Sequence, residues 1–248
     1  RRSDQPKLEL VIYGEALNDA QLKQWKKGAA QLAPSVPIHW IPGRKRELAG
    51  PVRWACDLFI SLADNPQETF GITPLEAMGA GLPCIVSDWD GYRDTVVQPG
   101  EAEEATGLRI PTRLQQGLGN PESIACINGA MGDRPAIGLL SQGIAVDLAV
   151  LRRSINQLLS NPEQRQAMGK AGQRRVARLY DWKVVIEQWR DLIEDLNQRR
   201  ESAREAGITL RPQLPPVRPN ISTAFGCYAT EVLPPDWNPP APDSDLEA

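Results

Sequence analysis

The chain has 248 residues, of which 41% are hydrophobic and 24% charged, and its formal net charge is -3. This length allows one large or two small domains, each with an apolar core. The slight negative charge argues against the basic field that nucleic-acid binding needs, so we expect no nucleic-acid partner. No apolar run approaches the length of a membrane span, so no transmembrane segment is predicted.

The cysteines and the single histidine limit the kinds of metal, disulfide and catalytic site that the chain could form. Cys56, Cys84, Cys126 and Cys227 are scattered, with no C-x-x-C pair. That spacing predicts neither a disulfide framework nor a zinc site, and it fits a reducing, cytoplasmic compartment. His39 is the only histidine, which leaves little room for His-based triads or His-rich metal sites, so we expect a structural role for it and no metal.

In the first half of the chain, apolar strands alternate with helices. We expect strands at residues 8–13, 38–41, 58–62 and 84–86, and helices at 19–32, 47–55 and 73–80. Strands that are uniformly apolar at this spacing indicate parallel βαβ units with helices on both faces. The predicted fold class is therefore α/β, with a Rossmann-like doubly wound parallel sheet that binds ligands at the carboxyl ends of its strands.

The second half looks different. Residues 100–142 are irregular apart from a possible edge strand at 107–111, and helices are expected at about 146–159, 162–179 and 182–206. An apolar stripe along the last helix is predicted to pack on a core. We therefore expect a domain over residues 1–206 and a Pro-rich extended tail over 207–248, which holds nine of the 22 prolines. Aromatic residues of the tail are predicted to anchor it on a neighbouring domain: Phe225, Tyr228 and Trp237.

The stretch over residues 64–83 follows a predicted strand and runs into a helix. Thr73 is a good N-cap, Pro74 suits the first helical position, and Glu76 stands three residues after the cap, as in a capping box. A helix N-terminus at the end of a strand offers free N–H groups and a partial positive charge, and Gly71 would let a phosphate approach the backbone. Diphosphate binding is therefore chemically reasonable, although the capping pattern alone favours a structural role for Glu76.

A family resemblance adds to this interpretation. Glu68 and Glu76, eight positions apart, frame Thr-Phe-Gly-Ile-Thr-Pro-Leu, which resembles the Glu-x7-Glu signature of the family-4 (group 1) retaining glycosyltransferases of GT-B fold. The continuation over residues 76–87, the preceding 57–61 and the closing pattern over 158–182 also resemble that family. The resemblance spans about residues 8–195, and it implies that the chain is the C-terminal, donor-binding half of a GT-B fold.

The resemblance also implies a role for each residue of the motif. Glu68 would contact the donor sugar at the catalytic centre, and Glu76 would bind the ribose hydroxyls of the nucleotide. Each carboxylate suits its task because it can accept two hydroxyl donors. The backbone of Phe70, Gly71 and Ile72 would face the diphosphate. Thr73 is a further candidate for the phosphate, with capping as the alternative explanation of its hydroxyl.

By the same resemblance, the full-length protein is a metal-independent, retaining transferase of hexosyltransferase type, with a nucleotide-diphosphate sugar as donor and no cofactor. The acceptor, a saccharide or a lipid-linked molecule, would bind an N-terminal domain that this chain lacks, so the chain alone is expected to be inactive. We expect a cytoplasmic protein, with peripheral attachment at the inner face of the membrane as an option. Two alternatives stay open: a non-catalytic nucleotide-sugar-binding or protein-interaction module, and a domain similar to sugar-nucleotide epimerases.

The sequence departs from the family pattern in two places. The Arg and Lys that usually bind the diphosphate come from a βα unit upstream of the first strand, and that unit is not found here. Arg44, Lys45 and Arg46 are interpreted instead as solvated loop charges. Residues 88–96 read Asp-Trp-Asp-Gly-Tyr-Arg-Asp-Thr-Val where most members have Gly-Gly followed by Glu. The role of this second segment in donor binding is left open by the sequence.

Overall fold

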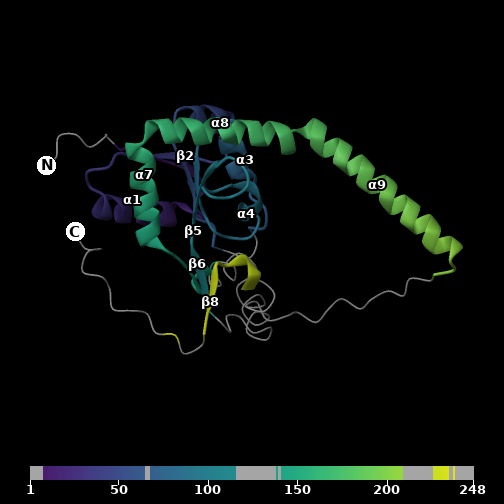
Figure 1. Cartoon of the computed structure of the whole chain (residues 1–248). Coiled ribbons are helices and arrows are strands. Elements are labelled where there is room, and N and C mark those ends of the chain that lie inside the picture. Colours follow the sequence, from purple (N-terminus) through teal and green to yellow (C-terminus); the bar gives the residue numbers. More distant parts are fainter. Residues whose placement is uncertain are drawn as a thin grey trace.

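The computed structural model describes residues 8–64, 68–115, 138, 141–208, 226–234 and 237, and it shows an α/β fold (Figure 1). The first half contains β1 (Leu10–Gly14), α1 (Asp19–Leu32), β2 (Ile38–Pro42), η1 (Arg46–Leu48), α2 (Ala49–Trp54), β3 (Phe59–Ser61), α3 (Ile72–Gly79), β4 (Cys84–Ser87), α4 (Tyr92–Thr95) and β5 (Gly107–Ile110). The second half contains β6 (Thr112–Gln115), β7 (Ile144–Val146), α7 (Leu148–Ser160), α8 (Pro162–Leu179), α9 (Trp182–Glu205), η2 (Gly226–Tyr228) and β8 (Glu231–Leu233).

The strands pair in three sheets. β1 pairs with β2, and β3, β4 and β5 follow one another, all in parallel. The third sheet has the order β7-β6-β8, with β6 antiparallel to β7 and parallel to β8. Parallel pairing across helical connections confirms the predicted α/β class, although the described strands form separate sheets rather than one. The predicted edge strand at 107–111 is also confirmed, because β5 is the outer strand of the second sheet.

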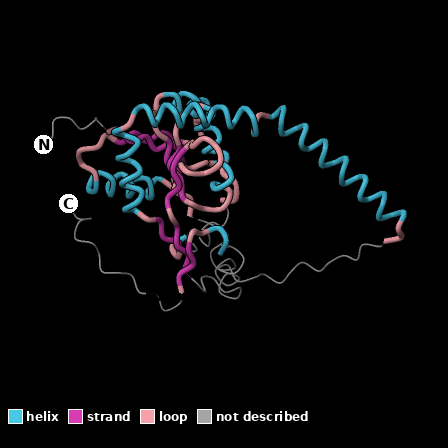
Figure 2. The backbone as a smooth tube through the Cα atoms, viewed as in Figure 1, coloured by secondary structure: helices cyan, strands magenta, loops and turns pink. Residues whose placement is uncertain are grey.

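The central strand, β4, has helices on both of its faces. Cys84 and Val86 pack in one buried cluster with Met78 of α3, whereas Ile85 packs in another with Leu158 of α7. Successive residues of a strand point to opposite faces, so these two clusters lie on opposite sides of the sheet. The uniformly apolar strand therefore marks a sheet covered on both faces, as predicted. Figure 2 shows the strands running through the middle of the body with helices around them.

Four helices begin at residues whose side chains accept a hydrogen bond from a backbone N–H of the first turn. These capping residues are Asn18, Asp147, Asn161 and Asp181, ahead of α1, α7, α8 and α9. Asn and Asp at this position satisfy an N–H group that the helix itself leaves unpaired. Local capping chemistry explains why the bounds of these helices could be predicted to within about two residues.

The apolar stripe of α9 is not part of the described core, so the predicted packing is wrong for the described part of the chain. Trp189 and Leu196 of this stripe are 60% and 54% exposed, and no residue of α9 is buried. Figure 1 shows α9 reaching away from the body. Helical spacing of apolar residues identifies a face that can be covered, but it does not identify what covers it.

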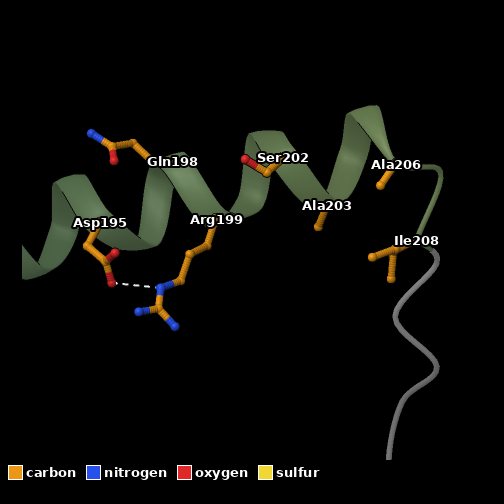
Figure 3. Close-up of a pocket in the computed structure, with 7 residues that line it drawn as sticks. All are labelled: Asp195, Gln198, Arg199, Ser202, Ala203, Ala206 and Ile208. Atoms are coloured by element: carbon orange, nitrogen blue, oxygen red, sulfur yellow. Dashed lines mark ion pairs between the residues drawn. The ribbon is translucent and has the colours of Figure 1, made fainter.

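The end of α9 is set by its backbone. Gly207 has a φ of 68°, and the N–H groups of Gly207 and Ile208 donate to the carbonyls of Arg204 and Ala203. This is the Schellman pattern, in which glycine adopts the left-handed conformation just past the helix. A surface hollow lies here, and Figure 3 shows it lined by Asp195, Gln198, Arg199, Ser202, Ala203, Ala206 and Ile208.

Part of the Pro-rich tail belongs to the fold. β8 runs beside β6, with Val232 opposite Leu114. The Tyr228 ring meets the Trp89 ring edge to face, with a centroid distance of 5.7 Å, so this predicted anchor packs on the same body and not on a neighbouring domain. Trp237 is 43% exposed, and Phe225 lies outside the described residues. The division of the chain at residue 207 stays a prediction.

No helix within the described ranges combines the length and the apolar character that a membrane crossing requires.

We predict opposite outcomes for two tryptophan truncations. Trp89 is fully buried, so Trp89→Ala should lower the free energy of unfolding by about 3–5 kcal/mol through lost burial and a cavity. Trp189 is 60% exposed, so Trp189→Ala in α9 should change it by about 0.5 kcal/mol or less. Urea unfolding of the two variants measures both values, and equal losses would contradict the exposed position of α9.

Candidate functional site

The motif over residues 68–76 lies at the carboxyl edge of the second sheet. β3 ends at Ser61 and pairs in parallel with β4, which places Ser61 opposite Val86. The chain segments that follow these two strands therefore leave the sheet at the same edge. We call residues 68–71, which precede α3, the loop, and residues 88–92, which follow β4, the turn. This edge is where parallel α/β sheets bind their ligands.

Two glycines bring the loop and the turn into close contact. Gly71 has a φ of 71°, and a Cβ added to it would lie 2.1 Å from Cε1 of Tyr92. A Cβ added to Gly91 would lie 2.1 Å from the carbonyl oxygen of Thr69. The Tyr92 ring thus occupies the space that a side chain at position 71 would need, and the backbone of the loop occupies the space that a side chain at position 91 would need. Gly71 is required for a second reason as well, because L side chains rarely adopt its conformation.

Tyr92 is the polar centre of this contact. Its side chain is buried, and its hydroxyl lies 2.8 Å from Oγ of Ser61 at the end of β3. The Tyr92 hydroxyl also forms a hydrogen bond with the side chain of Thr73. Burial raises the pKa of the Tyr92 phenol, and the nearby charge of Glu68 raises it further. Tyr92 therefore connects β3, the loop and the first turn of α3.

The predicted capping box at Thr73 is wrong. Helix α3 begins at Ile72, its N-cap is Gly71, and no side chain caps it. Because the left-handed conformation of Gly71 turns the chain into the helix early, Thr73 and Pro74 fall inside the first turn. The Thr73 hydroxyl bonds to Tyr92 instead of to the backbone. The helix N-terminus consequently has no side-chain cap, which keeps its partial positive charge available to a ligand.

Glu76 has a charged partner that the sequence reading missed. Nη2 of Arg53, from α2, donates to Oε2 of Glu76. Nη1 of Arg53 also donates to the Ala49 carbonyl at 3.0 Å, which fixes the guanidinium. The Arg53 side chain is 16% exposed and that of Glu76 is 46% exposed. Arg53 is 23 positions from Glu76, so no local sequence pattern could have paired them.

Glu68 is half-buried in the loop, and burial raises the pKa of its carboxyl group. Burial also raises the pKa of Asp64, which follows β3. Carboxylates that have lost part of their hydration gain more from hydroxyl donors than fully solvated ones do, and such groups are candidates for functional sites. Glu68 thus has the environment expected of a ligand-binding carboxylate.

The apolar members of the motif lie at the surface. Phe70 is 42% exposed and Ile72 is 66% exposed. The Phe70 ring lies edge to face against Tyr180, which follows α8, with ring centroids 6.0 Å apart. Both side chains thus lie at the surface, whereas the side chain of Tyr92 is buried.

The segment over residues 88–96, whose role the sequence left open, forms the base of the loop. Asp88 is its main electrostatic connection. Oδ1 of Asp88 lies 3.0 Å from Nε of Arg93 and 3.3 Å from Nε of Arg109, and its Oδ2 accepts a bond of 2.7 Å from Thr230 Oγ1. The carbonyl of Asp88 accepts from the Thr112 hydroxyl at 2.9 Å. One carboxylate therefore joins the end of β4 to α4, β5 and the tail.

The other predicted positions lie outside this contact. The side chains of Arg44, Lys45 and Arg46 are exposed around the turn after β2, as expected of solvated loop charges. His39 lies in β2, and its Nε2 is 2.8 Å from Oε2 of Glu9, so it belongs to a surface pair. The described ranges hold no cluster of three or more His, Cys, Asp or Glu side chains suited to a metal ion.

The fold and the site together define a Rossmann-like α/β protein with a glycine-containing loop and a helix N-terminus at a strand's carboxyl end. Residues 1–118, which include the loop and the turn, match the family described as Glycosyl transferases group 1. This match supports the family resemblance read from the sequence.

Two known proteins are similar over longer stretches. Glycogen synthase of Bordetella petrii is 28% identical over 146 residues, which cover 58% of this chain and 23% of that enzyme. A sucrose-phosphate synthase structure from Thermosynechococcus elongatus aligns with 78% of this chain and 39% of its own, at 23% identity and a TM-score of 0.46. The chain thus spans less than half the length of either protein.

We expect Gly71→Ala and Gly91→Ala each to lower the free energy of unfolding by about 1–3 kcal/mol, because the added methyl group forces the loop and the turn apart. Gly28→Ala is the control, because Gly28 lies inside α1 with nothing within 4 Å of an added Cβ. That control should gain about 0.5–1 kcal/mol. Urea unfolding checks all three variants, and a neutral Gly91→Ala would contradict the close contact.

A pH effect follows from the raised pKa of Glu68. The unfolded chain ionises this group near its ordinary pKa of about 4.3, before the folded chain does. The contribution of Glu68 to the free energy of unfolding therefore falls as pH rises from that value through the folded pKa. The Glu68→Gln variant has no carboxyl group to ionise at this position, so it does not lose this stability as pH rises. Its free energy of unfolding, relative to that of wild type, should therefore be higher at about pH 7 than at about pH 4. A difference between variant and wild type that is equal at both pH values in urea unfolding would contradict the burial of this carboxylate.

Proposed function

We propose that the loop and α3 bind the diphosphate sugar donor of a retaining, metal-independent glycosyltransferase of hexosyltransferase type, with this chain as the donor half of a GT-B fold. One observation carries the proposal: a desolvated carboxylate, Glu68, stands beside a helix N-terminus that has no side-chain cap, at the carboxyl edge of a parallel sheet. The match of residues 1–118 to group 1 glycosyltransferases supports the same conclusion.

Each residue of the motif has a task in this proposal. The backbone of Phe70, Gly71 and Ile72 and the start of α3 face the diphosphate, where N–H groups and the helix dipole attract an anion. Glu68 accepts hydroxyl groups of the sugar. Glu76 accepts the ribose hydroxyls. Since each carboxylate oxygen has two lone pairs, Glu76 can accept them while Arg53 holds one oxygen.

Thr73 is a weaker candidate than its neighbours. Its hydroxyl already bonds to Tyr92, so a bond to phosphate requires it to share or exchange that partner. We therefore assign the Thr73 side chain to positioning the loop and its backbone to the helix N-terminus.

The chemistry needs a stabilised leaving group and a positioned acceptor. The bond between the anomeric carbon and the diphosphate oxygen breaks, and a bond forms from the same carbon to a hydroxyl oxygen of the acceptor. Negative charge collects on the nucleoside diphosphate, which takes up the proton of that hydroxyl. The N-terminus of α3 is oriented to stabilise that charge without a metal. No cofactor is required. The acceptor, a saccharide or a lipid-linked molecule, binds a further domain, and the chain alone binds donor without transferring sugar.

The cellular setting proposed is the cytoplasm, with peripheral membrane attachment as an option. Cys56, Cys84 and Cys227 are free thiols, which suits a reducing compartment. A second candidate function, a non-catalytic interaction module, is favoured by one observation, the exposed apolar face of α9. Upstream sequence with an Arg and Lys pair would favour the enzyme over this module.

Calorimetric titration separates the two glutamates. We titrate the chain with UDP, GDP and ADP, and then with UDP-glucose, GDP-mannose and ADP-glucose. Glu76→Gln should weaken both the nucleotide and the sugar nucleotide about tenfold to a hundredfold, because it removes a charged hydrogen bond to the ribose. Glu68→Gln should weaken only the sugar nucleotide, by a similar factor.

The matched control is Glu194→Gln, an exposed residue of α9 that should leave binding unchanged. Arg53→Gln tests the partner of Glu76 separately from the ribose. No binding of any of the six ligands, or equal binding by wild type and Glu76→Gln, would contradict the proposed function.

A further inference from the structure

Residues 226–234, which we call the strap, return from the C-terminal tail to the third sheet and contact the turn of the candidate site. The strap comprises η2 and β8, and β8 pairs with β6. Figure 1 shows it beside β6 on the body of the molecule. It is more than 130 positions away from the turn along the chain, yet several of its polar groups contact residues 88–93.

Tyr228 contacts the turn through its backbone carbonyl, its hydroxyl and its ring. Its carbonyl accepts the backbone N–H of Asp90 at 3.1 Å, and its hydroxyl forms a hydrogen bond with the Asp90 carboxylate. Its ring lies edge to face on Trp89, which is fully buried. Both the backbone and the side chain of Asp90 are therefore held by one residue of the strap.

Two further strap residues act on the ends of the turn. Thr230 Oγ1 donates to Oδ2 of Asp88 at 2.7 Å. The Cys227 carbonyl accepts Nη1 of Arg93 at 2.9 Å. Thr230 and Thr112 also exchange backbone-to-hydroxyl bonds of 2.9 and 3.0 Å, which fix the strap to β6. The strap is thus tied to the sheet on one side and to the turn on the other.

The turn needs such support because its backbone is unusual. Asp90 has a φ of 33°, and it is the only non-glycine residue with positive φ in the described part of the chain. Such a conformation costs about 1–3 kcal/mol and persists only where neighbouring groups enforce it. The next residues, Gly91 and Tyr92, are the ones that contact Thr69 and Gly71 of the loop. Any relaxation at Asp90 therefore reaches the loop through one or two residues.

We infer that the strap is a positioning element of the donor site: Tyr228 and Thr230 hold the turn, and the turn holds the loop around Glu68 in its binding conformation. Neither strap residue contacts the proposed ligand. The consequence for ligand binding rests on the proposed function, whereas the effect on the loop does not. Release of the strap loosens the loop and lowers its affinity for the donor.

Hydrogen–deuterium exchange at the amides of residues 68–73 tests this inference without any ligand. Tyr228→Phe keeps the ring and removes its hydroxyl. Thr230→Val removes the bond to Asp88 of the turn, together with the acceptor of the Thr112 N–H in β6. Each variant should accelerate exchange in residues 68–73 about tenfold, the effect of losing roughly one hydrogen bond. Thr230→Ser restores the hydroxyl and should exchange as wild type does.

Glu231→Gln is the matched control on the same strap, because Glu231 pairs with Arg113 at 3.0 Å and not with the turn. It should leave exchange in residues 68–73 unchanged. Unchanged exchange there in both Tyr228→Phe and Thr230→Val overturns the inference, and so does an equal acceleration in Glu231→Gln. Thermal unfolding of each variant shows that the folded state is being compared.

A binding experiment tests whether the strap affects the proposed function. The nucleotide sugar bound most tightly by wild type is titrated into the same variants, and its dissociation constant should rise about tenfold in Tyr228→Phe and Thr230→Val. If wild type binds none, the proposed function fails while the exchange data still decide the role of the strap. If exchange accelerates but the dissociation constant does not change, the inferred control of binding is overturned.

Discussion

The close contact between the loop and the turn is the constraint on which the candidate site depends. Only glycine fits at positions 71 and 91, because an added Cβ would lie 2.1 Å from an atom of the opposing segment. The contact places Tyr92 under the loop, where its hydroxyl reaches both Ser61 and Thr73. It also fixes the left-handed Gly71 that starts α3 without a side-chain cap. Close packing of the Tyr92 ring against Gly71, and of the loop backbone against Gly91, thus sets the position of the helix N-terminus.

The two carboxylates of the proposed donor site have different surroundings. Glu76 is tied to the fixed guanidinium of Arg53, so its position is set before any ligand arrives. Glu68 is half-buried in the loop, and this burial raises the pKa of its carboxyl group. The Asp88 carboxylate forms ion pairs with Arg93 and Arg109 and accepts a hydrogen bond from Thr230. We propose that the Glu76 side chain is already positioned for a ligand, whereas the position of Glu68 can change. The position of Glu68 then depends on the contacts that hold the turn.

Local chemistry explains what could be predicted from the sequence. Helical spacing of apolar residues predicted the long helices, and uniformly apolar runs predicted the buried strands, because both signals lie within a few residues. The start of α3 was misplaced because the conformation of Gly71 depends on Tyr92, about twenty positions later. Arg53 and the strap were missed for the same reason, since their partners are distant in sequence. The face of α9 was correctly recognised as apolar, but its exposure depends on which surfaces lie nearby.

The central claim is that a nucleotide-diphosphate sugar binds between Glu68 and Glu76 at the N-terminus of α3. A crystal structure of the chain with the sugar nucleotide that it binds tests this most directly. We predict the diphosphate at the backbone of residues 70–72, a sugar hydroxyl on Glu68 and the ribose on Glu76. A ligand bound elsewhere, for instance in the hollow at the end of α9, with residues 68–76 unoccupied, would contradict it.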